Sequence, residues 1–479
     1  MKKIYIYALT TALIWGAAGC KKLSDFGDTN VDPATTTIPQ INALLTNVEN
    51  NISTYATTGT TAISGGQYAQ YFSETQYSGT SLYNLPQNSF TAIYNGNLYD
   101  LQNIINLNQS KNQSTVAKIL QQYIFWVVTD SWGDVPYSEA LKGLDAISPK
   151  YDKQEDIYKG ILANLTAAVG EFDGSAITGD IIYGGDVASW KRAANSLRLL
   201  VAIQLSKKVP SASGYAATAF KAALADGAGV ITTSSQNLQV EYPGGSFKSP
   251  WYVLYDGRQD YGEAKTMSDI LVGFNDARQT VYAGDNNAAG TTGTTTNGVP
   301  YGLERGKAND FIQSNADWAR VLRGDQRTAA GVATIITAGE VFLARAEAAN
   351  IGWTTEVAAT VYAEGIRQSF QQWGLTMPAS YLTQSGVALT GGVDDYKKIS
   401  TQRWIASYPD GHQGWNIWRK SGFPVLTPAP DAVPTSSGKI IRRFVYESLE
   451  YSTNGDNVNE AVARVTNYSQ DTPVWWDTH

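Results

Sequence analysis

Helical periodicity in long segments is the feature that most constrains how this chain can fold. In the segment 41–56, apolar residues recur at three- and four-residue spacing, so that Ile41, Leu45, Val48 and Ile52 share one face. Similar helical patterns continue through the segments 90–108, 116–128, 154–172, 186–208, 337–352 and 354–374. Because an amphipathic helix must bury its apolar face against another element, the sequence predicts a mainly helical, all-α body.

The segments 337–352 and 354–374 predict a helical hairpin. The first ends at Gly352, which is typical of a helix C-terminus, and Thr354 or Thr355 can cap the helix that follows. Alanines in both segments allow the two helices to approach closely. The pattern resembles a tetratricopeptide-type hairpin, but no regular period of about 34 residues is present. Degenerate repeats separated by insertions are therefore expected, with an ordinary irregular helical bundle as the alternative.

The stretch between residues 209 and 337 differs from the helical segments in its composition and pattern. Residues 284–298 form a low-complexity loop rich in Gly, Thr and Asn, and residues 231–242 are compatible with a short strand. Residues 242–264 predict a loop dense in rings and charges. No segment has the composition of a linker between two bodies, so the interpretation is one domain over 41–479 with long loop insertions.

The first 40 residues predict a lipid anchor. Two lysines and a short apolar run precede four small residues and Cys20, which is the only cysteine of the chain. The apolar run is too short to span a bilayer as a helix, and small residues directly before a cysteine resemble a bacterial lipobox. We expect a lipoprotein signal peptide over 1–19, a lipid on Cys20 and a polar tether over 20–40. An ordinary signal peptide and a buried core cysteine are the alternatives.

Charge and composition exclude several classes of partner and catalyst. The formal net charge is −7 and no basic stripe is present, which argues against nucleic acid as a partner. With one cysteine and two histidines the chain predicts no zinc site, and the segment around His412 lacks a nucleophile elbow. Acid pairs such as Asp130 and Asp134 leave a surface glycoside hydrolase as an alternative. We predict no catalytic residues, no metal and no cofactor.

Abundant aromatic residues suit contact with neutral polar ligands. The chain holds 28 Tyr and 13 Trp, and such rings can stack on the apolar faces of sugars or pack on peptide side chains. Tryptophans inside helical blocks are expected to pack between helices. Candidate ligand contacts lie instead in two ring-rich loops, 67–85 and 249–260, in which a ring could act beside an orienting charge. They are Tyr71, Tyr77 and Tyr83 in the first loop and Trp251, Tyr252, Tyr255, Arg258 and Asp260 in the second.

A set of ordered blocks resembles the SusD/RagB superfamily, specifically its SusD-like 2 branch from Bacteroidetes. The blocks occur in the same order from about residue 25 to the C-terminus, and the set is more specific than any one block. They include DFGDTNVDP (25–33), VVTDSWGDVPYSEALKG (127–143), GGDVASWKRAANSLRLLVA (184–202), GEVFLARAEAANIGW (339–353), ISTQRWIASYPDGHQGWNIWRKSGFPVL (399–426) and TPVWWD (472–477).

The resemblance implies a non-enzymatic outer-membrane lipoprotein built on tetratricopeptide-like hairpins, with loops elaborating one face. Such a protein captures an oligosaccharide or a peptide and closes as a lid over a SusC-like TonB-dependent barrel. A helical-repeat adaptor for protein partners is the other alternative. Family members often carry acidic residues soon after the lipid cysteine, whereas Lys21 and Lys22 stand there in this chain. The outer face of the outer membrane is expected, and the inner leaflet remains open.

Overall fold

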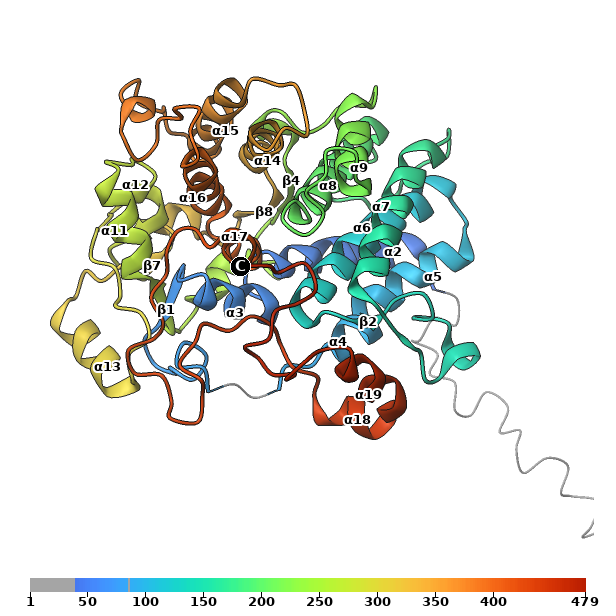
Figure 1. The fold of residues 1–479 in the computed structure, drawn as a ribbon, viewed down its shortest axis with the longest axis horizontal. Helices are drawn as coiled ribbons and strands as arrows, with labels where there is room; N and C mark the ends of the chain where they lie inside the picture. The colour runs from blue at the N-terminus through green and yellow to red at the C-terminus, as the bar shows by residue number, and fades with distance from the viewer. Residues whose placement is uncertain (1–38, 85–86) are drawn as a thin grey trace, which may run out of the picture. The chain divides into compact units, whose positions relative to one another are not determined.

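The computed structural model describes residues 39–84 and 87–479, and helices dominate it (Figure 1). The lipid-anchor prediction at Cys20 therefore lies outside the described residues. The helices are α2 (Ile41–Ile52), α3 (Thr60–Tyr68), α4 (Thr91–Ile93), α5 (Tyr99–Leu107), α6 (Lys111–Trp132), α7 (Gln154–Glu171), α8 (Val187–Gln204), α9 (Tyr215–Ala225), α10 (Pro250–Val253), α11 (Lys265–Gly273), α12 (Gln279–Tyr282), α13 (Arg305–Ser314), α14 (Ala338–Asn350), α15 (Ala358–Gln372), α16 (Asp395–Ser407), α17 (Gly411–Ser421), α18 (Ser448–Thr453) and α19 (Gly455–Ala463).

Short strands join distant parts of the chain in antiparallel pairs, β1 with β5, β2 with β3, β4 with β8 and β6 with β7. The predicted strand within 231–242 is confirmed as β4. The strands are β1 (Phe72–Glu74), β2 (Val135–Pro136), β3 (Tyr151–Asp152), β4 (Leu238–Glu241), β5 (Tyr261–Glu263), β6 (Ala283–Gly284), β7 (Arg320–Val321) and β8 (Val332–Ile336).

Neighbouring helices pack in sequence order, which is the arrangement expected of successive helical hairpins. Contacts link α5 to α6, α6 to α7, α7 to α8 and α8 to α9, and a second series runs through α14, α15, α16 and α17. The two series meet where α8 contacts α14. The mainly helical fold class is thus confirmed. Loops and the short helices α10 to α13 fill the long interval between α9 and α14 (Figure 1).

The α14–α15 hairpin forms where the sequence predicts it, but its second helix begins later than expected. Gly365 lies so close to α14 that an added Cβ would stand 2.7 Å from Leu343 Cγ. The expected cap at Thr354 or Thr355 is wrong, because α15 begins at Ala358 with Val357 at its N-cap. The chain first buries Trp353, whose Nε1 donates to Pro210 O at 2.9 Å, before it turns into the helix.

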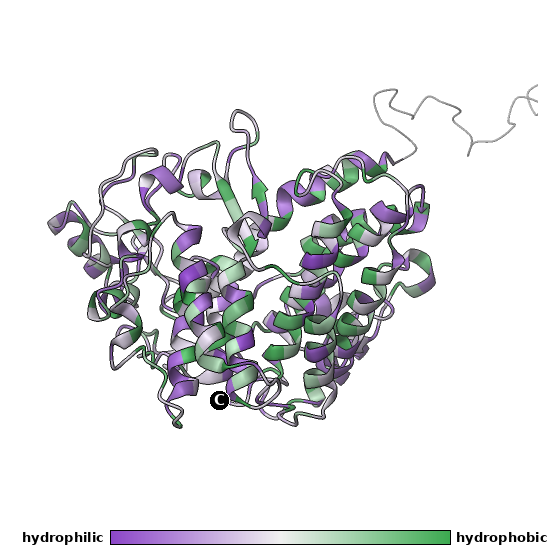
Figure 2. Cartoon of the chain, turned by 90° about the horizontal axis from the view of Figure 1, so that it is seen from above, coloured by the Kyte–Doolittle hydropathy of each residue, from purple (hydrophilic) through white to green (hydrophobic). Residues whose placement is uncertain are grey.

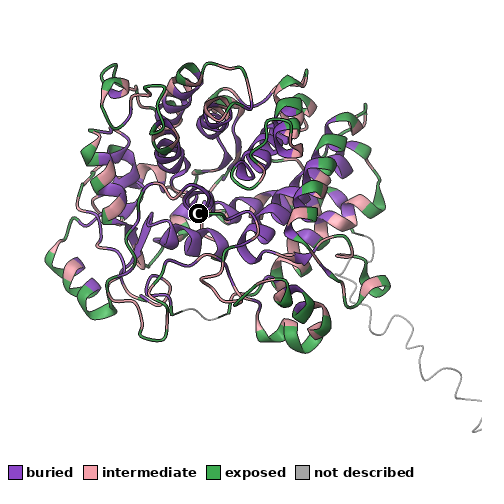
Figure 3. Ribbon diagram, viewed as in Figure 1, coloured by how far each residue is buried: buried purple, intermediate pink, exposed green. Residues whose placement is uncertain are grey.

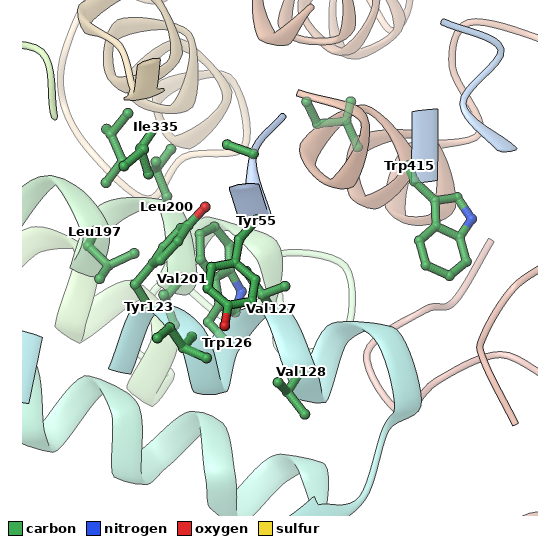
Figure 4. Packing of buried hydrophobic residues seen from close by; sticks show 14 of the residues in the cluster. Tyr55, Tyr123, Trp126, Val127, Val128, Leu197, Leu200, Val201, Ile335 and Trp415 are labelled. Atoms are coloured by element: carbon green, nitrogen blue, oxygen red, sulfur yellow. The ribbon is translucent and has the colours of Figure 1, made fainter. Parts of the chain in front are cut away.

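Apolar side chains from several helices meet in one core that includes Tyr55, Tyr123, Trp126 and Leu197 (Figure 4). Buried residues follow the inner faces of the helices, whereas loops and the short helices α13, α18 and α19 carry most exposed positions (Figure 3). Many helices carry both hydrophilic and hydrophobic residues, as amphipathic helices do (Figure 2). None of the described helices is long and apolar enough to cross a membrane.

Asp130 in the TDSWGD segment is a buried acid that forms hydrogen bonds with several parts of the core. It is buried and accepts hydrogen bonds from Tyr158 Oη at 2.5 Å, Asn416 Nδ2 at 2.6 Å and Trp476 Nε1 at 2.8 Å. Burial raises its pKa to about 7, although nearby Arg419 and these donors act in the opposite direction. The carboxylate therefore ties α6 to α7, α17 and the C-terminal segment.

Candidate functional site

Strand pairing brings the two ring-rich loops together, although about 180 residues separate them in the sequence. In the β1–β5 pair Phe72 stands opposite Glu263, and Glu74 stands opposite Tyr261. The ladder continues past the strand ends, because Thr75 N donates to Asp260 O at 2.9 Å. The residues just after β1 therefore lie beside the residues just before β5, and this register places Tyr77 next to the segment 257–260.

A shallow hollow of roughly 610 Å³ opens at this junction. It contains four of the eight predicted ligand residues, two of which contribute rings and two of which contribute charges. Gly257, Gln259 and Asn287 complete its lining. The size falls within the range of roughly 300–1,000 Å³ that is usual for small-molecule sites. The predicted residues in the lining are Tyr77, Tyr255, Arg258 and Asp260.

Tyr77 and Arg258 are the most accessible members of the site. The Tyr77 residue is 63% exposed, and the Arg258 side chain is 60% exposed. Arg258 Nε donates to Asp260 Oδ2 at 2.6 Å, and this bond raises the pKa of the guanidinium. The pair offers hydrogen-bond donors and acceptors in the same hollow as an exposed aromatic ring.

Tyr255 is a buried residue that lines the hollow. Its Oη accepts from the Val321 amide at 2.8 Å and donates to Tyr261 O at 2.7 Å, so it joins β7 to β5. The Arg327 guanidinium lies 4.3 Å from the centre of its ring. Burial raises the pKa of Tyr255 to about 12, with Arg327 acting against the shift, so the phenol stays neutral. Tyr255 thus lines the hollow while its hydroxyl links the two strands beside it.

The other predicted residues lie elsewhere. Tyr71 is fully buried, with its hydroxyl donating to Trp404 O and its ring 4.8 Å from that of Trp404. Tyr83 is also buried, and its hydroxyl accepts from the Ala429 amide at 2.9 Å. Neither ring offers a free face in this structure. The ligand-contact role of the whole set stays a prediction.

Trp251 and Tyr252 flank the site without lining it. Trp251 is buried and faces a separate hollow of about 500 Å³ beside the β4–β8 ribbon. Tyr252 is half-buried and lines a small recess of about 130 Å³ that shares Tyr255 and Asn287 with the main hollow. Lys248 Nζ lies 4.9 Å from the centre of the Tyr252 ring. Tyr252 therefore lies in a recess that adjoins the main hollow.

Gly257, Gln259 and Asn287 were not predicted from the sequence as ligand residues, and of the three only Asn287 lies outside both predicted loops. It belongs to the low-complexity loop 284–298, which offers no local signal of a binding role. Arg320 Nε donates to Asn287 Oδ1 at 2.8 Å, Arg327 Nη1 donates to its carbonyl at 3.2 Å, and its own Nδ2 donates to Gln259 Oε1 at 3.2 Å. These bonds fix part of the loop against the floor of the site.

The hollow is suited to binding a polar ligand. It presents a free ring, an ion pair and two side-chain amides, which together can stack on an apolar face and satisfy hydroxyl or amide groups. Among the described residues, no group of three or more His, Cys, Asp or Glu side chains could hold a metal ion.

Comparison with known proteins places the chain among binding proteins of the outer membrane. The family model described as "Starch-binding associating with outer membrane" (SusD-like_2) matches residues 32–447. A search of curated proteins gave no match.

Solved structures agree with that match. A protein titled as chitin-binding is 25% identical, with a TM-score of 0.79, and the alignment covers 92% of this chain and 100% of that one. A SusD homolog from Bacteroides uniformis is also 25% identical, with a TM-score of 0.78 and coverage of 92% and 99%. A chitin-binding SusD homolog from Flavobacterium johnsoniae, at 23% identity, has the same TM-score of 0.78 over 92% and 99% of the two chains, and shows the same fold.

Proposed function

This chain belongs to the SusD-like family, and from that premise we propose that it is a carbohydrate-binding lipoprotein whose ligand lies in the hollow between Tyr77 and Arg258. The family is one of proteins that associate with the outer membrane. In the proposed mechanism the protein captures an oligosaccharide outside the cell and passes it to a SusC-like TonB-dependent transporter. It acts there as a lid and carries out no chemical step.

The convergence of two distant loops at one hollow is the observation that carries the proposal. An exposed tyrosine has a surplus of apolar surface that a pyranose ring can cover, and removing this surface from water stabilises the complex. The Arg258–Asp260 pair supplies charged groups that can hydrogen-bond to hydroxyls and fix the orientation of the sugar. A ring beside such a pair is a chemically coherent carbohydrate site.

An oligosaccharide fits this site better than a single sugar. The recess beside Tyr252 shares Tyr255 and Asn287 with the main hollow, so a second sugar unit has a place to lie. Chitin oligosaccharides are the first ligands to try, because two of the similar structures are titled as chitin-binding. The amides of Gln259 and Asn287 can also pair with an acetamido group.

Substitution of Tyr77 tests the site. We expect Tyr77→Ala to weaken oligosaccharide binding by about tenfold, since the loss of one stacking ring costs about 1–1.5 kcal/mol. The measurement is isothermal titration calorimetry with chitin and malto-oligosaccharides on the full-length chain in detergent. Tyr99→Ala is the matched control, because Tyr99 is 50% exposed on α5 and does not line the hollow.

Two outcomes would contradict the proposal. If Tyr77→Ala and Tyr99→Ala bind a ligand of the native chain with equal affinity, the hollow is not the binding site for that ligand. Binding of peptides from a library, with no affinity for any glycan, would replace the carbohydrate by the peptide alternative.

The lid role and the absence of turnover need separate experiments. Co-purification with a large TonB-dependent barrel supports the transporter partner, whereas recovery with other proteins alone supports an adaptor. Release of reducing sugar from a bound glycan would instead make the protein a surface glycoside hydrolase.

A further inference from the structure

Arg443 is a buried cation without a counter-charge. The residue is 2% exposed, and it forms no ion pair with any residue that the structure describes. Its Nη2 donates to Trp132 O, and its guanidinium lies 4.6 Å from the centre of the Tyr468 ring. Its Nε has no hydrogen-bond partner within residues 39–84 and 87–479. Removing a guanidinium from water without an anion is costly, so this position favours a negative partner.

Arg443 lines a hollow of about 490 Å³ that is distinct from the carbohydrate site. The hollow lies between the turn at Gly133, the start of α7, the end of α19 and the C-terminal segment 472–475. It shares no lining residue with the hollow at Tyr77. The cations that line it are Lys153, Arg443 and Arg464.

Both carboxylates of the hollow already have partners. Asp134 Oδ2 pairs with Arg464 Nη1 at 2.8 Å, and its Oδ1 accepts from the Gln154 amide at 2.8 Å. Glu155 pairs with Lys159 at 2.8 Å. Within the described chain this leaves Arg443 and Lys153 without an ion pair, so the hollow carries an uncompensated positive charge.

Two further groups at the hollow could contribute to binding a ligand: the N-terminus of α7 and the side chain of Gln154. The hollow lies at the N-terminus of α7, a helix of 18 residues, whose macrodipole adds partial positive charge. Gln154 is 1% exposed and lines the hollow, where its Oε1 has no hydrogen-bond partner in the part of the chain that the structure describes. This acceptor can pair with a hydroxyl that lies beside an anionic group.

Gly133 allows Arg443 to reach this position. Its φ is +88°, in a region that other residues rarely adopt. A Cβ at Gly133 would stand 2.7 Å from Arg443 Nη2. The WGD turn therefore supplies Trp132 O as an acceptor, leaves space for the guanidinium at Gly133 and pairs Asp134 with Arg464.

We propose that the hollow around Arg443 and Lys153 binds a small oxyanion, carried by an acidic sugar or free in solution. A carboxylate, sulfate or phosphate group would accept charge-assisted hydrogen bonds from Arg443 and Lys153. Trp475, which also lines the hollow and is half-buried, gives a ring for a sugar that carries the anion.

Calorimetry with sodium glucuronate, sulfate and phosphate tests this site in the full-length chain in detergent. Ionic strength is held constant with chloride, and glucose serves as the neutral comparison. Saturable binding of at least one anion is expected. Lys153→Gln should weaken it by about tenfold, because one charge-assisted hydrogen bond is lost. Lys150→Gln, at an exposed lysine outside the hollow, should leave it unchanged.

Arg443→Lys gives a second measurement, since it keeps the charge but loses the planar donor array and should also weaken anion binding. Circular dichroism checks its folding, and Lys153→Gln carries the test if Arg443→Lys does not fold.

Binding of glucuronate alone would identify an acidic sugar as the ligand, and binding of all three probes would identify a free oxyanion. No saturable binding of any probe, or equal affinity of Lys153→Gln and Lys150→Gln, would overturn the proposal. Chitin-oligosaccharide binding by the same variants reports separately on the Tyr77 site.

Discussion

Tyr71 and Tyr77 lie six residues apart in one tyrosine-rich loop, and the fold uses them differently. Tyr71 precedes β1 and packs its ring against Trp404 and Tyr408. Tyr77 follows β1 and leaves most of its surface exposed at the candidate site. The residue type is the same, so only the position relative to the strand and its neighbours separates a core residue from a ligand candidate.

Glu263, on the strand that orders the candidate site, gives a prediction about pH and stability. The carboxyl is fully buried, and Ser268 and Gln279 donate to its Oε1. Its Oε2 has no hydrogen-bond partner among the described residues. Burial raises its pKa to about 7 from the usual 4.5. The folded state therefore holds this proton more tightly than the unfolded chain, so the free energy of unfolding should fall as pH rises from about 4.5 through 7.

Glu263→Gln should remove the part of the pH dependence of stability that comes from this carboxyl group. Relative to the variant, the native chain should lose up to about 3 kcal/mol of stability between pH 4.5 and 8. Urea unfolding at several pH values measures the difference, and Glu241→Gln, at an exposed acid on β4, is the control. Parallel stability curves for the native chain and Glu263→Gln would show that Glu263 does not titrate in this range.

At the scale of elements, close approach of helices depends on residues without bulk. Gly365 of α15 faces Leu343 of α14 at a distance that leaves no room for a Cβ. A Cβ added to Gly339 of α14 would make a tight contact with Ser369 Cβ, at 3.2 Å. Thr337 and Glu340 fix the start of α14 through a capping box. The hairpin is therefore specified by its small residues and by its cap.

Two glycine-to-alanine changes test this account. Gly365→Ala should destabilise the protein by about 1–3 kcal/mol, because the added methyl group overpacks the α14–α15 contact. A Cβ at Gly306 in α13 would meet only Glu304 Oε1, at 4.0 Å, so Gly306→Ala should stabilise by up to about 1 kcal/mol through helix propensity. Thermal unfolding of both variants checks the pair. Stabilisation by both changes would mean that the hairpin relaxes around the methyl group.

At the scale of the whole molecule, the lipid on Cys20 is the predicted link between a carbohydrate-binding body and the membrane. Cys20→Ser should move the protein from the detergent phase to the aqueous phase in Triton X-114 partition, because an acyl anchor supplies most of the apolar surface for membrane binding. Ser24→Ala, four residues further on, should leave the partition unchanged. Retention of Cys20→Ser in the detergent phase would show that something else anchors the chain.

Protease treatment of intact cells then distinguishes the two leaflets of the outer membrane. Digestion of the native chain is expected, because capture of a ligand for import requires an outward-facing protein. Protection in intact cells, with digestion after lysis, would place the protein on the inner leaflet despite its lipid.

The mainly helical fold, the family and the hairpin at 337–374 could be predicted from the sequence, because helical periodicity and ordered blocks are local signals that one chain carries in full. The sequence also placed four lining residues of the candidate hollow within two ring-rich loops. The division into signal peptide, tether and single domain stays a prediction.

Which of those residues lie together depends on how the chain folds in three dimensions. The pairing of β1 with β5 is a long-range contact between strands of three residues each, and such short strands have no periodicity that could reveal their partner. For the same reason the sequence could not separate buried Tyr71 and Tyr83 from exposed Tyr77, nor find Asn287 in a low-complexity loop. Burial and proximity depend on neighbours distant in sequence, and these are set only when the helices pack.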